Sequence, residues 1–136
     1  MAFLPFVDTN VFLRHIRQDH LDHSPRATAY MTRIRRGELV VQTNVLVISE
    51  VVFTLQSFYR YSKPAVANVL LPLINLPGLK IPAKPRLRRA LALYALYNVS
   101  FVDAYLAALA QQRRLSELVS FDRNYDRILG VPRIEP

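Results

Sequence analysis

Short apolar runs alternate with longer helical segments along this chain, and that alternation limits the folds open to it. Each run is brief and rich in branched or aromatic residues, which is typical of a buried strand. Strands that are separated by helices pair in parallel and are covered on both faces. The sequence therefore predicts an α/β fold, a three-layer α/β/α sandwich around a short central parallel sheet. The predicted strands are residues 3–7, 39–41, 79–81 and 117–120.

The predicted helices begin and end at residues that cap or break a helix. Ser24 and Pro25 mark one helix start, with Ser24 as N-cap, and Gly37 marks its end. Pro72 should kink or end the helix in which it lies. The chain of 136 residues shows no linker-like change in composition, so we expect a single domain over residues 1–136. The helices are predicted at 10–17, 24–36, 44–59 (capped by Thr43 or Asn44), 62–75, 86–98 and 101–114, with a helical turn at 125–129.

The composition excludes several classes of protein. The chain has no cysteine, which rules out a disulfide scaffold, a thiolate metal site and a cysteine nucleophile. This fits a reducing compartment, and we expect a cytoplasmic protein. The start of the chain lacks the basic segment of a signal peptide. The most apolar stretch is interrupted by Gln42, Asn44 and Glu50, so we expect no membrane span.

The charge balance makes nucleic acid the first partner to consider. The formal net charge is +8, and 15 of the 18 basic residues are arginine. Arginine offers a planar fork of donors that matches a phosphate group. A merely basic, soluble surface is the alternative. Arg123 and Arg127, on either side of Asp122, are the better candidates for contact with an RNA backbone.

Four of the ten acids stand where ordinary surface acids are uncommon. Asp8 and Asp122 each follow a predicted strand, and Glu50 and Asp103 lie in apolar helical segments. Each also has a simpler explanation. Asp8 is a good N-cap, Asp103 completes a capping box with Ser100, and Asp122 is a common turn residue. Glu50 could share an exposed stripe with Thr54 and Ser57.

The four acids together point to a metal-dependent site. The carboxyl ends of parallel strands meet at one edge of a sheet, where α/β proteins bind their ligands. Several carboxylates in one cleft cannot all ionise unless a cation neutralises them. Oxygen ligands without histidine or cysteine favour Mg²⁺ or Mn²⁺ over Zn²⁺. Arginines around such a cleft would hold a polyanion.

The chain resembles the PIN-domain ribonucleases, specifically the VapC-type toxins of toxin–antitoxin pairs. The resemblance rests on four segments in order: Asp8-Thr9-Asn10, the segment 45–50 that ends in Glu50, the segment 101–108 around Asp103, and the segment 120–126 around Asp122. Each segment alone is weakly specific. All four in this order, in a chain of this size, form a strong signal.

The resemblance implies an Mg²⁺- or Mn²⁺-dependent endoribonuclease, a phosphodiester hydrolase. Asp8, Glu50 and Asp103 match the core acids of the family, Asp122 matches a fourth and more variable acid, and Asn10 and Ser120 match supporting polar residues. The resemblance also implies a homodimer and an inhibitory antitoxin protein. Ser100 and Asn124 stand where many relatives carry further acids. We therefore expect one firmly bound metal, with a second arriving only with RNA.

Two other functions remain open: a nucleic-acid-binding module with a vestigial metal site, and a PIN nuclease of RNA processing with no antitoxin. His15, His20 and His23 lie outside the four segments and are read as surface or loop residues, which disfavours histidine acid–base catalysis. Two aromatic groups are read mainly as packing residues: Tyr94, Tyr97 and Tyr105, in the core or at a subunit interface, and Phe53, Phe58, Tyr59 and Tyr61, in the core rather than at an antitoxin groove.

Overall fold

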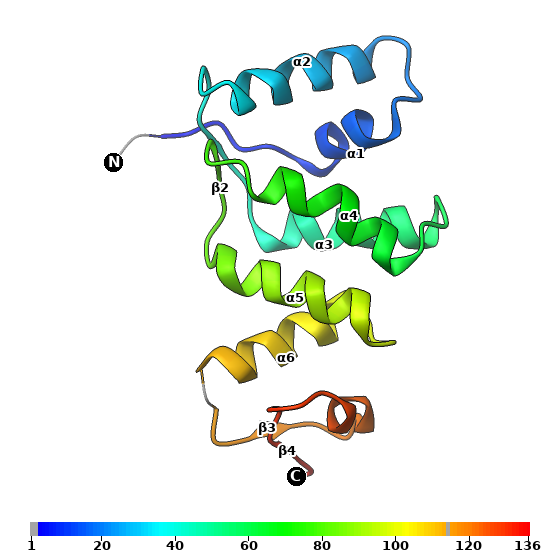
Figure 1. The fold of residues 1–136 in the computed structure, drawn as a ribbon, viewed down its shortest axis with the longest axis vertical. Coiled ribbons are helices and arrows are strands. Elements are labelled where there is room, and N and C mark those ends of the chain that lie inside the picture. The colour runs from blue at the N-terminus through cyan, green and yellow to red at the C-terminus, as the bar shows by residue number, and fades with distance from the viewer. Residues whose placement is uncertain (1–2, 114) are drawn as a thin grey trace. The chain divides into compact units, whose positions relative to one another are not determined.

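A computed structural model describes residues 3–113 and 115–136 of the chain. These residues form two units, the first ending at Lys84 and the second beginning at Pro85. Each unit combines helices with one pair of short parallel strands (Figure 1). The predicted α/β class is therefore present in both units. The strands of each unit form a two-stranded parallel sheet of their own.

Three extended segments run in parallel in the first unit. β1 (Val41–Gln42) pairs with β2 (Leu79–Lys80), with Val41 opposite Leu79. Gln42 also forms a parallel bridge with Phe6, and its carbonyl accepts a hydrogen bond from the Val7 N–H at 2.9 Å. The strand predicted at 3–7 is thus reduced to a single bridge residue, and the one predicted at 39–41 begins two residues later.

The helices of the first unit start close to their predicted positions. They are α1 (Thr9–Arg17), α2 (His23–Arg35), α3 (Val45–Ser57) and α4 (Lys63–Ile74). The Asn44 side chain caps α3 by accepting the Val47 N–H at 3.2 Å, and Ser62 caps α4 in the same way. α1 packs against α2 and α3, and α3 against α4 (Figure 1).

Pro72 does not end α4 at once, because the helix continues for two more residues to Ile74. A proline in a helix leaves the carbonyl four residues earlier without its usual donor. That residue here is Asn68, and both Asn68 and Pro72 are exposed. Water can therefore reach the orphaned carbonyl, which lowers the cost of keeping the proline inside the helix.

The start of α2 differs from the prediction, since Ser24 does not cap it. Ser24 is buried, and its hydroxyl accepts a hydrogen bond from the His20 N–H at 3.2 Å. The cap is instead the His20 ring, whose Nδ1 accepts the N–H groups of Asp22 at 3.2 Å and His23 at 2.8 Å. The predicted stop after α2 is confirmed, because Gly37 adopts a φ of 77°.

His15 links α1 to α2 and makes the first unit sensitive to acid. Its Nδ1 lies 2.9 Å from the Thr28 hydroxyl. Burial, and then the charge of Arg35, lower the pKa of His15 from its ordinary value of 6.5. The unfolded chain therefore takes up the proton first as the pH falls through 6.5, and the folded state loses stability until His15 itself is protonated.

We expect His15→Gln to lessen this acid sensitivity, because glutamine keeps a polar partner for Thr28 and does not titrate. Thermal unfolding at pH 7.5 and pH 5.5 measures it. The fall in Tm between the two should be smaller in the variant than in the unaltered chain. Equal falls in both proteins would show that the His15 contact does not cause the sensitivity.

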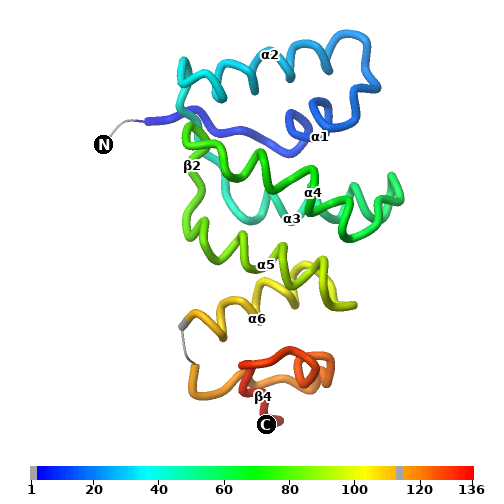
Figure 2. Tube along the Cα trace, in the orientation of Figure 1, coloured from blue at the N-terminus to red at the C-terminus, as the bar shows by residue number. Residues whose placement is uncertain are grey.

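The second unit is held together by two helices and a folded-back tail (Figure 2). α5 (Lys84–Leu96) and α6 (Phe101–Arg113) are joined by hydrogen bonds from Arg86 Nε to Gln112 at 2.8 Å and from Arg89 Nε to Gln111 at 3.0 Å. The tail contains β3 (Leu118–Val119), the 3₁₀ helix η1 (Arg123–Arg127) and β4 (Arg133–Ile134), and β3 and β4 pair in parallel. β4 was not predicted.

The core of the second unit explains the apolar pattern of its helices. Tyr94 is fully buried, as predicted, and its ring meets Phe101 edge-on at 6.1 Å between centroids. Tyr97 and Tyr105 are half-buried. The predicted last residue of α6, Arg114, lies outside the described residues. Small residues along α6 allow close packing of this helix, and they are Ala104, Ala107, Ala108 and Ala110, all buried.

Candidate active site

Asp8 lies where an extended segment ends and α1 begins. Its Oδ1 accepts the Thr9 N–H at 2.7 Å, so the predicted role as N-cap is confirmed. The carboxylate is exposed and follows a segment that runs parallel to β1. The Thr43 hydroxyl donates to the Val7 carbonyl at 2.9 Å, which ties this end of the segment to the start of α3. Asp8 is therefore an N-cap that also stands at the end of an extended segment, and its part in a metal site stays a prediction.

Glu50 lies on an exposed stripe of α3. The stripe consists of Leu46, Glu50, Phe53 and Ser57. Glu50, Phe53 and Ser57 follow Leu46 by four, seven and eleven residues, so all four side chains share one helix face. Leu46 is 74% exposed and Phe53 is 68% exposed. The predicted exposed stripe is therefore confirmed for Glu50 and Ser57, whereas Thr54 is half-buried. The Glu50 carboxylate stands between two apolar side chains at the surface.

The packing role predicted for four aromatic residues is wrong for half of them. Phe53 and Phe58 are exposed, whereas Tyr59 and Tyr61 are half-buried. The Arg17 guanidinium covers the Tyr59 ring at 4.2 Å and donates to the Tyr61 hydroxyl at 3.3 Å. Periodicity places α3 correctly but does not show which of its apolar faces the protein covers.

Tyr125 binds one of the predicted acids of the second unit and lies within the electrostatic reach of another. Its ring is 4% exposed, and its hydroxyl donates to Asp103 Oδ1 at 3.1 Å. Burial raises the pKa of Tyr125, and the Asp103 charge, the hydrogen bond to Asp103 and the Asp122 charge raise it further. Tyr125 therefore remains a neutral hydroxyl donor beside two carboxylates.

Asp103 and Asp122 are each positioned by a local cap. The Ser100 hydroxyl accepts the Asp103 N–H at 3.1 Å, which confirms that Ser100 caps α6. Asp122 caps η1, since its Oδ1 accepts the Asn124 N–H at 2.8 Å. The Ser120 hydroxyl in turn accepts the Asp122 N–H at 3.0 Å. Ser120 thus orients the loop that carries Asp122.

Three of the four acids share one pattern that suits a hard cation. In Asp8, Asp103 and Asp122, Oδ1 accepts a hydrogen bond from the protein. Among residues 3–113 and 115–136, no hydrogen bond or ion pair occupies the second oxygen of these carboxylates. A carboxylate held by one oxygen and open at the other is a ready Mg²⁺ or Mn²⁺ ligand.

The two units divide the predicted site residues. Asp8, Asn10 and Glu50 belong to the first unit, and Asp103, Ser120 and Asp122 to the second, with Arg123 and Arg127. Within neither unit do three histidine, aspartate or glutamate side chains of the described residues gather closely enough to hold a metal ion. Carboxylate oxygens are the kind of ligand that a hard divalent cation takes.

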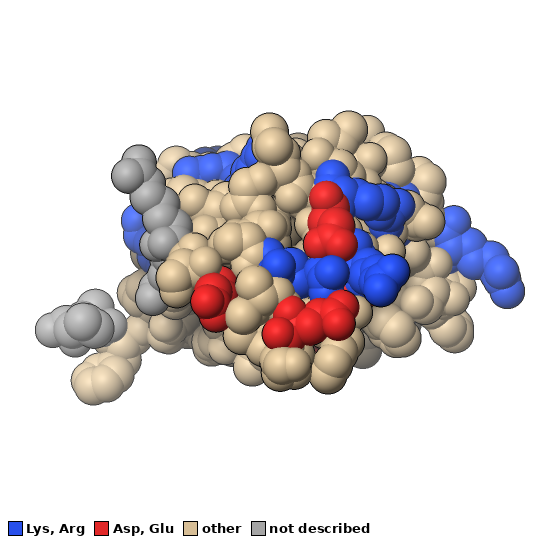
Figure 3. Space-filling model, turned by 90° about the horizontal axis from the view of Figure 1, so that it is seen from below, with Lys and Arg blue, Asp and Glu red and all other residues tan. Residues whose placement is uncertain are grey.

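Asp126 has a partner that removes it from the set of available acids. Arg133 binds it through two hydrogen bonds, at 2.7 and 3.0 Å, and also donates to Glu135 at 3.0 Å. The bond to Arg133 lowers the pKa of Asp126. Figure 3 shows a face of the molecule on which acidic side chains lie next to basic ones. Sequence reasoning did not find Arg133, whose partner lies seven residues earlier.

The two arginines beside Asp122 are both exposed, but they differ in their contacts. Arg127 donates to the Asn98 carbonyl at 3.0 Å and to the Asn124 side chain at 3.2 Å. Arg123 contributes positive charge near Asp126 and lowers its pKa further. Of the two guanidinium groups, Arg127 is therefore the one held by hydrogen bonds to the protein.

Comparison with known proteins now gives the family. The PIN domain family matches residues 6–130, a span that includes all four acids and crosses from the first unit to the second. The chain is also 28% identical over 90 residues to a VapC ribonuclease of Aquifex aeolicus (strain VF5), and the alignment covers 66% of each protein. That alignment spans just under two thirds of the relative's length.

The comparisons agree with the architecture described above. Among the described residues, no helix combines the length and apolar character needed to cross a membrane. The family match confirms the predicted α/β fold class, and it extends over most of the chain. The sequence, the capped acids at the ends of extended segments and the family match lead to one conclusion: this chain belongs to the PIN domain family.

Proposed function

We propose that this protein is an Mg²⁺- or Mn²⁺-dependent endoribonuclease and the toxin of a toxin–antitoxin pair. The observation that carries the proposal is the buried Tyr125 hydroxyl, which holds Asp103 through a hydrogen bond and lies near enough to Asp122 for that charge to raise the pKa of Tyr125. Membership of the PIN family supports nuclease activity, and similarity to a protein named VapC ribonuclease supports RNA as the substrate. The net charge of +8 suits a polyanion.

The four acids have distinct proposed roles. Asp8, Asp103 and Asp122 would hold the cation through their open oxygens, and Glu50 would ligate it or orient the attacking water. A bound divalent cation lowers the pKa of water and offsets charge on the phosphate. Ser120 holds the Asp122 backbone through its hydroxyl, and Asn10 would support the site as a polar neighbour of Asp8. Arg123 and Arg127 would contact the RNA backbone. No histidine has a role in this proposal.

The wider assembly follows from the same resemblance. We propose that residues 1–136 act as a single PIN domain, which the continuous family match across Lys84 and Pro85 supports. A homodimer and an antitoxin partner are proposed as well. The exposed apolar residues beside Glu50 give a partner surface next to a proposed catalytic acid. We propose that the protein acts in the cytoplasm.

Induced expression in a bacterial host, with Asp8→Asn as the matched variant, tests the proposal. The unaltered chain should arrest growth and yield new fragments in extracted RNA, and Asp8→Asn should do neither. Asparagine can still accept the Thr9 N–H, so α1 should keep its cap. Comparable soluble amounts of the two proteins, measured in the same cells, make the comparison valid.

The other outcomes separate the alternatives. RNA fragments without growth arrest would favour a nuclease of RNA processing. RNA binding without fragments, in both proteins, would favour a binding module with a vestigial site. Growth arrest that persists in Asp8→Asn would contradict the proposed role of Asp8. A short reading frame just upstream that encodes a DNA-binding pattern would favour the toxin.

A further inference from the structure

A cleft between α1 and α2 lies outside the proposed catalytic acids. It has a volume of about 520 Å³, and its lining comes from the segment before α1 and from the facing sides of both helices. This volume falls within the range of roughly 300–1,000 Å³ that is typical of ligand sites. The lining residues used below are Phe6, Asn10, Arg14, His23, Arg26 and Tyr30.

The cleft combines positive charge with aromatic surface. Arg14 from α1 and Arg26 from α2 both line it, together with His23, and no carboxylate of the described residues does. Phe6 is 52% exposed, and Tyr30 is half-buried. Guanidinium groups bind phosphate, and aromatic rings stack on bases. The cleft therefore offers a partner for the phosphate of a nucleotide and another for its base.

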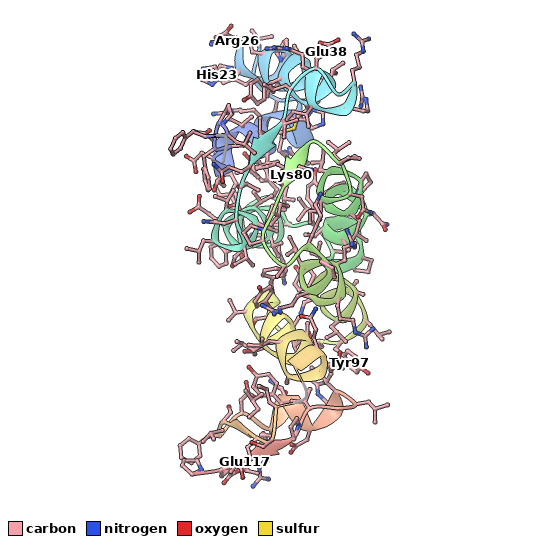
Figure 4. All side chains as sticks on the ribbon, turned by 90° about the vertical axis from the view of Figure 1, so that its left-hand side faces the viewer. His23, Arg26, Glu38, Lys80, Tyr97 and Glu117 are labelled. Carbon is pink, nitrogen blue, oxygen red and sulfur yellow. The ribbon has the colours of Figure 1, made fainter. Side chains whose placement is uncertain are left out.

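Helical spacing keeps these side chains on the cleft. Asn10 and Arg14 are four residues apart on α1, and His23, Arg26 and Tyr30 are three and seven residues apart on α2. Figure 4 shows His23 and Arg26 as neighbours on α2. The His20 ring stacks on His23 at 3.9 Å between centroids, which holds His23 at the rim.

The arginines keep donors for an incoming phosphate. Arg14 lies 3.8 Å from Asp19, and Arg26 lies 3.2 Å from Asp22. Both pairs are solvent-exposed, and such pairs contribute little and exchange readily. A guanidinium group carries five donors, so one carboxylate contact leaves most of them available.

We infer that this cleft binds one nucleotide of the single-stranded RNA beside the phosphodiester bond that is cut. The inference rests on the proposed function. Asn10 connects the cleft to the proposed site, because it lines the cleft and stands two residues after Asp8. The base stacks on Phe6 or Tyr30, and its phosphate lies between Arg14 and Arg26. An acidic protein segment would use the arginines but not the paired aromatic surface.

Binding of a fluorescein-labelled, random-sequence RNA octamer in EDTA tests the inference without cleavage. The double variant Arg14→Gln/Arg26→Gln should weaken binding about 10-fold or more, since each loses charge-assisted hydrogen bonds. The slope of log Kd against log salt should fall by about 0.7, the value for one phosphate contact on a single strand. Arg33→Gln/Arg36→Gln removes the same charge from exposed positions that do not line the cleft.

A second pair of variants tests the stacking surface. Phe6→Ala should weaken binding about 10-fold, which is within the usual effect of removing one stacking ring. Phe3→Ala is the matched control, because Phe3 is fully exposed and does not line the cleft. Thermal unfolding of each variant identifies any loss of fold. Phe6→Leu, which keeps apolar bulk without a ring, replaces Phe6→Ala should the alanine variant unfold.

The result that overturns the inference is equal RNA binding in the arginine double variant and its control. The inference would also be overturned if the arginine double variant lost binding to an antitoxin but bound RNA as the unaltered chain does. That result would assign the cleft to a protein partner. Cleavage of RNA by the unaltered chain with Mn²⁺ is measured in parallel. Normal cleavage with equal binding overturns the cleft alone, whereas neither cleavage nor binding in the unaltered chain overturns the proposed function too.

Discussion

Replacing Asp103 with asparagine is expected to lower metal-dependent RNA cleavage by at least about 100-fold, because loss of an outer-shell partner alone costs about 10- to 100-fold. Asparagine keeps an oxygen that can accept the Tyr125 hydroxyl, so the packing around Tyr125 should survive. The substitution removes the negative charge of a proposed metal ligand. Cleavage of total RNA by pure protein, with Mg²⁺ or Mn²⁺ against EDTA, measures the effect.

Asp126→Asn is the matched control for this experiment. It makes the same chemical change in the same unit, but Asp126 is bound to Arg133 and lies outside the proposed ligands. Asparagine keeps one oxygen that can accept an Arg133 N–H, so the loop should keep its tie to Arg133 and the variant should retain most of the activity. Cleavage that survives both EDTA and Asp103→Asn would point to a contaminant or a different site, and equal loss in both variants would deny Asp103 a special role.

Replacing Tyr125 with phenylalanine is expected to weaken Mn²⁺ binding about 10- to 100-fold, the usual effect of removing an outer-shell hydrogen bond. The change leaves the buried ring in place and removes only the hydroxyl that donates to Asp103 at 3.1 Å. Asp103 then loses the contact that fixes its orientation. Tyr125 is thus a positioning residue rather than a ligand.

Calorimetric titration with Mn²⁺ measures this effect independently of cleavage. Tyr105→Phe is the matched control, since its hydroxyl meets Arg86 at 3.4 Å and none of the four acids. Thermal unfolding should show that both variants fold. Unchanged Mn²⁺ affinity in Tyr125→Phe would show that the hydroxyl serves only the packing of the second unit.

The helices were the most predictable part of this fold, because their caps are local. Asn44, Ser62 and Ser100 each bond an N–H three residues on, within one turn of their own chain. The start of α2 could not be predicted in this way, since its cap is the ring of His20. Histidine is not a usual capping residue, and Ser24 offers the more obvious pattern.

The strands were less predictable, because pairing depends on distant partners. The segment at 3–7 has strand composition, but only Phe6 bridges to Gln42. β4 is two residues long, and its residues pair with β3 residues fifteen positions earlier in the sequence. Neither its length nor its composition distinguishes it from a terminal loop.

The acids of the site could be named from sequence, but the groups that hold them could not. Asp8 and Asp122 stand at ends of extended segments, which the pattern of apolar runs indicates. The contact between Tyr125 and Asp103 joins residues 22 positions apart, and no local rule predicts it. Glu50 shows the same limit, since an apolar helix conceals which face is exposed until its neighbours are placed.

The contacts of Arg133 extend beyond Asp126. The same guanidinium also donates to the Ser120 carbonyl at 3.0 Å, while Ser120 N–H donates to Ile134 at 2.9 Å. The segment that carries Asp122 and Tyr125 is therefore fastened at both ends to the last strand of the chain. Local opening of that segment and detachment of the strand become one cooperative event. The position of Asp122, a proposed metal ligand, therefore depends on residues outside the proposed ligand set.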